Sequence, residues 1–364
     1  MKKRNLIIIA VVIVLGIVTA VVFSNKSKNH TFEQDYHIEN VNTITKIFMS
    51  DKLDNSVLLT RAEDDTTWVV NGKYPASQGK MDLLLETLNQ MRIRQKVNRN
   101  AVRNIVKNLS VSSTKVEVYQ EVPFINWFGG KLQLFKREKL VATYYVGHET
   151  QDNMGTYVFR EGDDEPCVIH IPGFRGFLGP RFESVPDLWR SHRIVDLPVT
   201  DIQSVKVEIP SQPQESFEVR RHNDDGFDFY MQNQKVPAFD TVRVAQLLSS
   251  FVNLNFDQFA GVVPKVELDT TFSREPSFRL SVTSTRGKTR SLCTYVKFTN
   301  PDLLMEEGAK DKYIDFFDVD RLYAILDTKD TVLIQYYVFD DILQPASFFL
   351  GKGSLERSTR TTSK

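Results

Sequence analysis

Two stretches of the chain repeat one pattern, and this internal repeat limits the possible folds more than any other feature. Residues 61–97 and 221–259 each run from an Asp-Asp turn through an aromatic strand and a polar turn into an amphipathic helix. Such self-similarity predicts two copies of one supersecondary unit. The shared turn residues fall at a constant spacing of 162: Asn71, Lys73, Pro75 and Ala76 correspond to Asn233, Lys235, Pro237 and Ala238.

The elements around each copy predict an α+β fold. Alternating apolar residues with Asn-Gly and Asp-Gly turns indicate hairpins before each helix. The helices are expected over Gly79–Met91 and Thr241–Val252, each with one apolar stripe that can cover a sheet. Strand-rich sequence follows, with short helices expected at Ala101–Asn108 and Val319–Leu326. We therefore predict two tandem antiparallel-sheet-plus-helix modules, over residues 32–197 and 198–350.

An unbroken apolar run near the N-terminus predicts a membrane anchor. Leu6–Phe23 contains no charged residue and is long enough, as a helix, to span a bilayer. A cleavable signal peptide is the alternative, but the run continues past the small residues of the possible cleavage site at Ala20. The basic residues that precede the run place the N-terminus in the cytoplasm by the positive-inside rule: Lys2, Lys3 and Arg4.

The flanks of this run complete the expected organisation. In a bacterium the anchor would lie in the inner membrane, and the bulk of the chain would be periplasmic. A polar linker is expected between the anchor and the first module, and the polar C-terminal end has nothing to bury, which predicts a disordered tail. The segments are a basic cytoplasmic stub at 1–5, the transmembrane helix at 6–23, the linker at 24–31 and the tail at 351–364.

The composition excludes several classes of protein. The 46 Lys and Arg balance the 46 Asp and Glu, which argues against nonspecific nucleic-acid binding, and we expect no nucleic-acid partner. Beyond the anchor 43 basic residues face 46 acidic ones, so the exported part is slightly acidic. The two thiols, Cys167 and Cys293, lie in apolar strands and are expected to be buried and free, an oxidised pair being the alternative.

A search for catalytic and metal-binding patterns leads us to expect no catalytic residue, no cofactor site and no metal site. Ser112 and Lys115 have the Ser-x-x-Lys spacing of penicillin-binding enzymes, but the companion motifs are missing, which favours a helix-to-strand connection. The histidines are scattered without a ligand spacing. Asp318 or Asp320 is expected to cap the helix predicted after it. No small-molecule ligand is indicated.

Two aromatic segments are the candidate partner-binding sites. The first is a Gly- and Pro-rich loop, which offers Arg and aromatic side chains of the kind enriched at binding hot spots: Phe174, Arg175, Phe177, Leu178, Arg181 and Phe182. Its alternative role is to plug the end of the first module against Trp189. The second is a hairpin tip with Trp127 and Phe128, for which core packing is the alternative.

The segment Arg92–Val97 is a third feature of interest. As a strand it places Arg92, Arg94 and Lys96 on one face. Clustered cations can meet an acidic partner or anionic headgroups. A solvated strand face, or a sheet edge protected by charge, is the alternative that we favour.

The ordered set of motifs resembles a family of bacterial envelope proteins known as domain of unknown function 4340. The resemblance rests on the N-terminal run, Trp68–Ala76, the following Leu84–Leu88 helix, Lys115–Tyr119 and the Pro172–Leu178 loop, and is fainter in the second repeat. It implies a membrane-anchored periplasmic protein that accompanies ABC transporter components of the gliding-motility type. It implies no catalytic residue.

These observations give a leading hypothesis and two alternatives. We expect a non-enzymatic, membrane-anchored accessory or scaffold subunit with a protein partner in an envelope transport or motility-type complex. The first alternative is a module that binds or hydrolyses glycan or peptidoglycan, which would need converging carboxylates in a pocket. The second is a purely structural spacer, which would tolerate substitution at Arg175 and Arg181.

Overall fold

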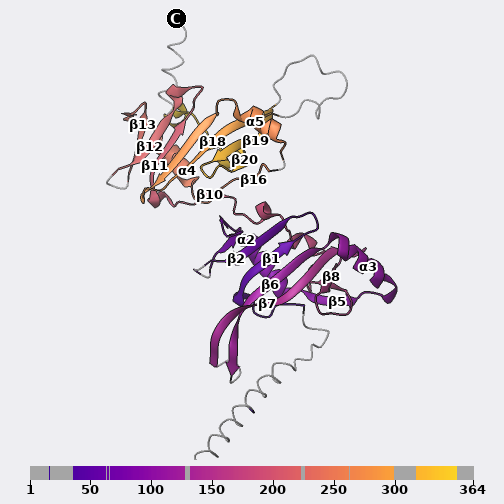
Figure 1. Ribbon diagram of the computed structural model, residues 1–364. Coiled ribbons are helices and arrows are strands. Elements are labelled where there is room, and N and C mark those ends of the chain that lie inside the picture. Colours follow the sequence, from indigo (N-terminus) through magenta and orange to yellow (C-terminus); the bar gives the residue numbers. More distant parts are fainter. Residues whose placement is uncertain are drawn as a thin grey trace, which may run out of the picture. The chain divides into compact units, whose positions relative to one another are not determined.

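The computed structural model divides the chain into two compact units, unit 1 (Met1–Ser191) and unit 2 (His192–Lys364). The structure describes residue 16 and residues 36–350, except 63, 65, 128–131, 223–225, 262 and 299–316. Figure 1 colours unit 1 from indigo to magenta and unit 2 from pink through orange to yellow. The division lies upstream of the expected boundary at 197/198, because the strand at Arg193–Val195 pairs within unit 2.

Unit 1 is built on one sheet that has nine strands in the described part of the chain. Each strand is antiparallel to its neighbours, in the order β4-β3-β2-β1-β6-β7-β8-β9-β5. The strands are β1 (Ile44–Ser50), β2 (Ser56–Arg61), β3 (Trp68–Val70), β4 (Tyr74–Pro75), β5 (Arg92–Lys96), β6 (Thr114–Trp127), β7 (Leu132–Glu149), β8 (Thr156–Arg160) and β9 (Cys167–His170).

Unit 2 repeats this topology. Its described residues form a nine-stranded antiparallel sheet in the order β14-β13-β12-β11-β17-β18-β19-β20-β16. β10 and β15 pair separately. The strands are β10 (Arg193–Val195), β11 (Ile202–Glu208), β12 (Phe217–Arg221), β13 (Phe227–Met231), β14 (Gln234–Lys235), β15 (Leu254–Asn255), β16 (Gln258–Phe259), β17 (Phe278–Ser284), β18 (Thr289–Phe298), β19 (Phe317–Leu326) and β20 (Thr331–Gln335).

The correspondence between the units extends to single side chains. Arg61 Nε donates to the Ile44 carbonyl at 2.9 Å, and Arg221 Nε donates to the Ile202 carbonyl at 2.8 Å. In the hairpin turns Asn71 and Asn233 have φ of 51° and 62°, a left-handed conformation that Asn tolerates well. The predicted α+β class and the two sheet-rich units are therefore confirmed.

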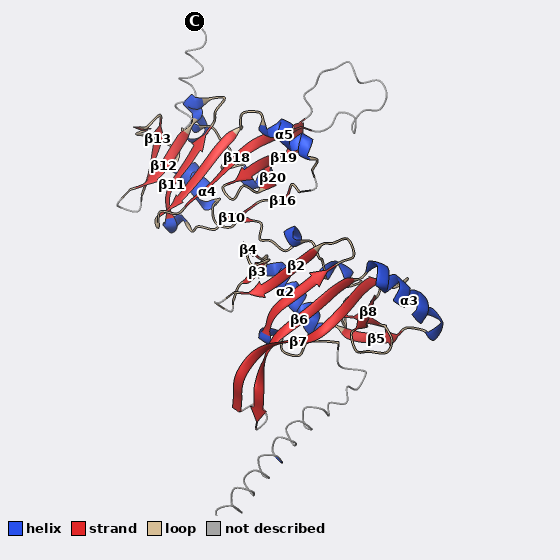
Figure 2. Cartoon of the chain, viewed as in Figure 1, coloured by secondary structure: helices blue, strands red, loops and turns tan. Residues whose placement is uncertain are grey.

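One helix in each unit lies against the sheet (Figure 2), and its apolar stripe enters the core. α2 (Gln78–Gln90) buries Met81, Leu84 and Leu88 in the core of unit 1. α4 (Thr241–Ser249) buries Val244, Leu247 and Leu248 in the core of unit 2, and the Asp240 carboxylate caps it by accepting hydrogen bonds from Val242 N and Arg243 N. Both helices start within one residue of their expected first residues.

The remaining helices lie at the edges of the units. α3 (Arg99–Ser112) contacts β7 and β8, where Gly147 lets Leu109 approach closely, because a Cβ at Gly147 would overlap Leu109 Cδ2. α5 (Lys265–Phe272) is its counterpart on β18. The short elements are η1 (Val41–Thr43), η2 (Gly179–Arg181), η3 (Pro186–Leu188), η4 (Val199–Asp201), η5 (Pro213–Glu215), α6 (Tyr336–Phe339) and α7 (Ala346–Phe349).

The prediction of one helix is wrong. Val319–Leu326 was expected to be a helix but lies in β19, which pairs with β18 on one side and β20 on the other. Asp318 consequently caps no helix. Its Oδ1 accepts hydrogen bonds from Asp320 N and Arg321 N, both at 3.0 Å, and so closes a turn at the start of the strand.

The two ends of the chain carry expectations that the structure does not test. Among the described helices, none is long and apolar enough to cross a membrane. The run Leu6–Phe23, apart from Gly16, and the expected tail at 351–364 lie outside the described residues. The predicted anchor and tail therefore stay predictions.

Candidate docking surfaces

The Gly- and Pro-rich loop follows β9 and is held by its backbone. Phe174 N donates to the Ile171 carbonyl at 3.0 Å. Gly173 and Gly176 adopt φ of 83° and 145°, which side chains rarely allow. A Cβ at Gly176 would lie 3.0 Å from the Phe174 ring, so this glycine lets the ring fold back over its own loop.

Two of the candidate residues anchor this loop and cannot face a partner. Leu178 and Phe182 are 0% and 1% exposed and share the core of unit 1 with Trp189. Leu178 N also donates to Thr156 Oγ1 at 2.6 Å. For these residues the alternative, packing against Trp189 at the end of the module, is what the structure shows.

The other end of the loop is presented to solvent. Phe174 is 37% exposed, Arg175 is exposed and Phe177 is half-buried. The Arg181 guanidinium lies 4.5 Å from the Phe174 ring centroid and donates to Thr87 Oγ1 at 2.9 Å, which ties the loop to α2. Phe174 and Arg175 thus stand on a braced support, which lowers the ordering cost of binding.

A small apolar hollow adjoins the loop. It has a volume of about 80 Å³ and lies between α2 and the residues that follow the loop, with Leu83 and Leu188 41% and 40% exposed at its rim. It can accept one partner side chain. The sequence gives no direct signal for it, because Leu83 belongs to an apolar helix pattern whose buried face alone is predictable.

The hairpin of β6 and β7 extends beyond the sheet as a two-stranded arm. β1 pairs with β6 only as far as Gln120, and β8 pairs with β7 only from Tyr144 onward. The arm, residues 121–127 with 132–139, is therefore paired only with itself among the described strands (Figure 1). The strand pairing continues to the outer end of the arm, where Ile125 pairs with Leu134 and Trp127 with Leu132.

The arm is a feature of unit 1 alone. The corresponding strands of unit 2, β17 and β18, pair as far as Thr283 with Thr289 and are joined by a tight turn in which Gly287 has φ of 77°. Trp127 lies at the outer end of the arm, where the sequence predicts the tip of a hairpin. Phe128 lies outside the described residues.

A serine–histidine contact lies on the surface at the end of α3. Ser112 Oγ lies 2.7 Å from His148 Nε2, but its hydroxyl donates to the Asn108 carbonyl at 3.0 Å, and both side chains are exposed. Lys115 pairs with Glu117 at 2.6 Å, which raises the pKa of the lysine and disfavours its use as a base. The predicted helix-to-strand connection is confirmed, since α3 ends at Ser112 and β6 begins at Thr114.

A hollow in unit 2 gathers carboxylates, as the glycan alternative would require. It has a volume of about 440 Å³ and includes Glu208, Glu218 and Glu275 in its lining. Glu208 pairs with Lys206 and Glu218 with Arg220, each at 2.6 Å. Two of the three carboxylates in this hollow are therefore already engaged by a cation of their own strand.

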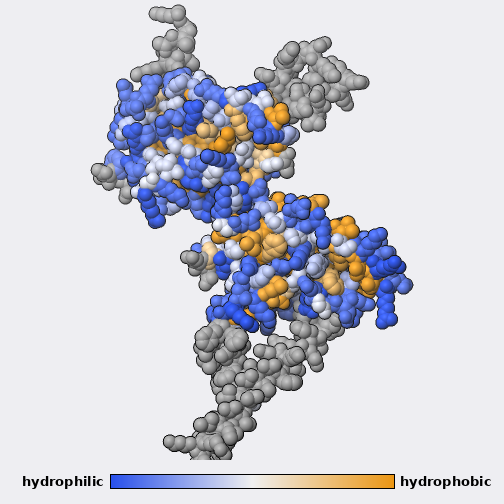
Figure 3. Space-filling view, viewed as in Figure 1, coloured by the Kyte–Doolittle hydropathy of each residue, from blue (hydrophilic) through white to orange (hydrophobic). Residues whose placement is uncertain are grey.

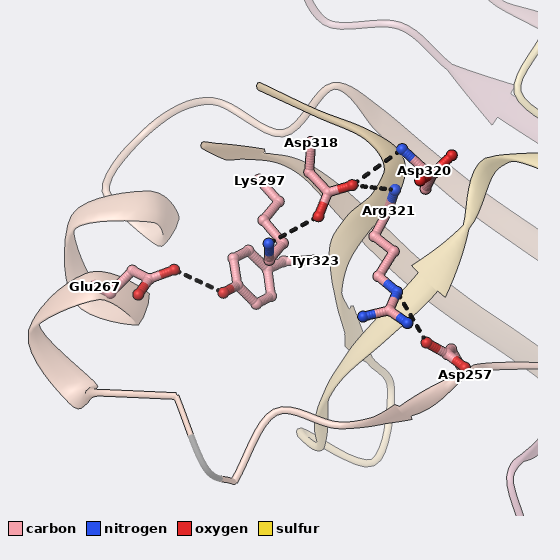
Figure 4. Close-up of polar contacts among 7 residues, drawn as sticks. All are labelled: Asp257, Glu267, Lys297, Asp318, Asp320, Arg321 and Tyr323. Atoms are coloured by element: carbon pink, nitrogen blue, oxygen red, sulfur yellow. Dashed lines mark hydrogen bonds and ion pairs between the residues drawn. The ribbon is translucent and has the colours of Figure 1, made fainter. Parts of the chain in front are cut away.

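A polar network crosses β18, β19 and α5 of unit 2 (Figure 4). Lys297 Nζ contacts Asp318 Oδ2 at 2.8 Å, Arg321 Nε contacts Asp257 Oδ2 at 3.1 Å, and Tyr323 donates to Glu267 at 2.7 Å. Burial and the Glu267 contact raise the pKa of Tyr323. The Tyr323–Glu267 contact holds α5 on β19, whereas the two ion pairs join β19 to β18 and to the residue before β16.

The two thiols are unpaired in the structure and sit in different units. Burial raises the pKa of Cys167 to about 11, and burial also raises the pKa of Cys293. Both are therefore poor nucleophiles at neutral pH. Among the residues that the structure describes, no three His, Cys, Asp or Glu side chains are grouped to hold a metal ion.

Comparison with known proteins identifies one family. Its model, described as Domain of unknown function (DUF4340), matches residues 68–272, from β3 of unit 1 to α5 of unit 2. No curated protein and no solved structure matches the chain. The match covers more than half of the chain and includes the strands and helices on which the resemblance was noted, so the chain belongs to the DUF4340 family.

Proposed function

We propose that this protein is a non-enzymatic, membrane-anchored accessory subunit of a bacterial envelope complex of the transport or motility type. In this proposal the run Leu6–Phe23 holds the chain in the inner membrane, and unit 1 binds a protein partner in the periplasm. Two described elements of unit 1 would make the contact. One is the arm, and the other is the loop that carries Phe174 and Arg175.

The arm is the observation that carries the proposal. A two-stranded ribbon outside a sheet is marginally stable in water, and each of its outer edges leaves backbone groups without a third strand. A protein that adds a strand to one of these edges would satisfy those backbone groups.

The second unit shows that the fold does not require the arm. Unit 2 completes the same nine-strand order, in its described residues, with a tight turn between β17 and β18. The arm therefore adds nothing that the sheet needs. The braced loop supports the same function, because exposed Arg and aromatic residues on a rigid support are frequent hot-spot residues.

The direct test places photo-crosslinking residues in the full chain in native membranes. We expect crosslinkers at Trp127 and Phe174 to capture the same protein, identified by mass spectrometry. A crosslinker at Tyr337 of unit 2, which is 78% exposed, serves as the matched control and should not capture it. Capture of one protein equally from all three positions would contradict a specific surface on unit 1.

A turn-exchange variant tests whether the arm itself is required. Residues 120–139 are replaced with the five residues 284–288 of unit 2. Ile44 pairs with Gln120 as Ile202 pairs with Ser284, so Tyr119 with Leu140 corresponds to Thr283 with Thr289. We expect the sheet to fold and the crosslink from Phe174 to be lost or reduced at least tenfold. Unchanged crosslinking in a folded variant would refute the role of the arm.

A further inference from the structure

One face of unit 1 concentrates positive charge although the chain as a whole is neutral. Between Glu86 and Glu117 the sequence contains seven Lys and Arg residues and no Asp or Glu. This segment forms β5, the last strand of the sheet, and α3, which follows it directly. We call the surface of these two elements the α3–β5 face. Six of the seven cations lie on this face, namely Arg92, Arg94, Lys96, Arg99, Arg103 and Lys107, whereas Lys115 lies in β6 and pairs with Glu117.

Three of these cations form a row along α3. Arg99, Arg103 and Lys107 recur every four residues, so they lie on one side of the helix, and all three are exposed. Within the described part of the chain none of the three has an ion pair with a carboxylate. Like charges at this spacing repel one another, so the row lowers the stability of the isolated helix.

The helix is also amphipathic and only partly covered. Leu109 is its buried residue among the described side chains, while Val106 and Val111 are 46% and 66% exposed. Figure 3 shows hydrophilic and hydrophobic residues adjoining each other at this end of unit 1. A helix with a basic row beside exposed apolar residues has the composition of helices that lie in a bilayer interface.

The rest of the face carries few compensating acids. Arg94 pairs with Asp152 at 2.9 Å, and Arg92 donates to the carbonyls of Asn89 and Met91 at 2.8 and 2.9 Å. The counterpart helix of unit 2, α5, has no such row, because it mixes Lys265 with acidic residues. The fold therefore does not require the charge.

We propose that the α3–β5 face docks on anionic phospholipid headgroups. Charge complementarity supports anionic headgroups as the ligand of this face. The length of the chain between the predicted anchor and unit 1 supports it as well. Residues 24–35 connect the predicted anchor to the first described residue of unit 1 and span at most about 40 Å when extended. Any face of unit 1 can then touch the headgroups of the same membrane. The inference rests on the membrane anchoring in the proposed function, but not on its protein partner.

The test uses the full chain reconstituted into phosphatidylcholine vesicles with or without phosphatidylglycerol. Amide hydrogen exchange is measured by mass spectrometry for peptides that cover 92–112. We expect slower exchange in the anionic vesicles only, and loss of this protection as salt rises, since screening weakens headgroup attraction. Equal exchange in both kinds of vesicle would overturn the proposal.

A charge-reversal variant of α3 tests whether the row of cations is responsible for the docking. Arg99→Glu, Arg103→Glu and Lys107→Glu together should shift the docking equilibrium by on the order of a hundredfold, from about fivefold for each cation. The matched control reverses three exposed cations of unit 2, Lys265, Arg286 and Lys288, with the same change in net charge, and should leave the protection intact. If the control removes the protection equally, total charge and not this face is responsible.

Two further outcomes separate this inference from the other proposals. If soluble polyglutamate protects 92–112 as well as anionic vesicles do, the face binds an acidic polypeptide and the lipid proposal is wrong. The turn-exchange variant should keep its lipid-dependent protection while losing the partner crosslink. A charge-reversed chain that loses lipid protection but keeps the crosslink at Phe174 would confirm that the two surfaces act independently.

Discussion

The contact between Leu109 and Gly147 offers a sharp test of how α3 is attached to unit 1. Leu109 is 7% exposed and fills the space over Gly147, where a Cβ would overlap its Cδ2 and lie 3.3 Å from the Tyr157 carbonyl oxygen. Gly147→Ala should therefore displace Leu109. Leu109→Ala should instead leave a cavity under the helix.

The magnitudes follow from the packing. Overpacking at Gly147 should lower the free energy of unfolding of unit 1 by about 1–3 kcal/mol. Leu109→Ala should lower it by about 2–3 kcal/mol, near the low end of buried leucine truncations because the site is at the rim of the unit. In the double variant the added Cβ enters the vacated space, so the two losses should fall short of their sum by about 1–2 kcal/mol.

The three tryptophans allow the free energy of unfolding of unit 1 to be measured within the full chain. Trp68, Trp127 and Trp189 all belong to unit 1, and two of them, Trp68 and Trp189, are only 3% exposed. Urea unfolding followed by tryptophan fluorescence in detergent therefore reports on unit 1 even if unit 2 unfolds separately. Circular dichroism on the same samples reports on both units.

Two results would refute the reasoning. Strict additivity of the single variants would show that Leu109 and Gly147 do not share space. An unchanged tryptophan transition in Leu109→Ala, with helicity lost at low urea, would show that α3 opens locally and does not contribute to the cooperative unit.

Three further predictions use the same chain. Arg61→Gln and Arg221→Gln should each lower the free energy of unfolding by about 1–3 kcal/mol, because each removes a charged donor from a part-buried carbonyl, but only Arg61→Gln should shift the tryptophan transition. Cys167 should react with a thiol reagent only on unfolding, because a pKa of about 11 leaves about a thousandth of the thiol ionised at pH 8; Cys167→Ala identifies its signal. Burial opposes the ionised form of Asp51, but hydrogen bonds from Asn55, Ser184 and the backbone outweigh it and lower the pKa to about 2. The stability that the Asp51 carboxylate adds should be present above pH 4 and lost as pH falls toward 2. Asp51→Asn should make the free energy of unfolding depend less on pH in this range.

The sequence predicts the parts of the fold that depend on local pattern. The repeated turn around Asn71 and Asn233, the helices α2 and α4, and the charged edge strand β5 all follow from residue spacing that a single element contains. β5 was expected to be a strand with a solvated face or a charge-protected edge, and it is the last strand of its sheet. Helical spacing and positive-φ turns need no tertiary information.

The features that the sequence did not predict depend on contacts between elements. In Val319–Leu326 apolar residues recur at helical spacing, but pairing with β18 and β20 makes the segment a strand that buries Leu322 and Ala324. Short apolar runs of this length fit either structure until their partners are known. In the candidate loop no local pattern distinguishes buried Leu178 from exposed Phe174, so the sequence could not separate the residues that anchor the loop from those that face solvent.

The duplicated topology leads to a last prediction, about where the stability of the chain depends on binding. Unit 1 keeps an unsupported arm and a row of like charges on α3, both of which lower its stability, while unit 2 reaches the same strand order without either. If both features serve binding, ligands should stabilise unit 1 selectively. The tryptophan transition of the full chain should therefore move to higher urea in anionic vesicles than in zwitterionic ones. Hydrogen exchange in the core strands of unit 2, such as β11, should stay unchanged. A parallel shift of both units would instead indicate a general effect of the vesicle surface, and no shift would mean that the charge row on α3 has a purpose other than membrane contact.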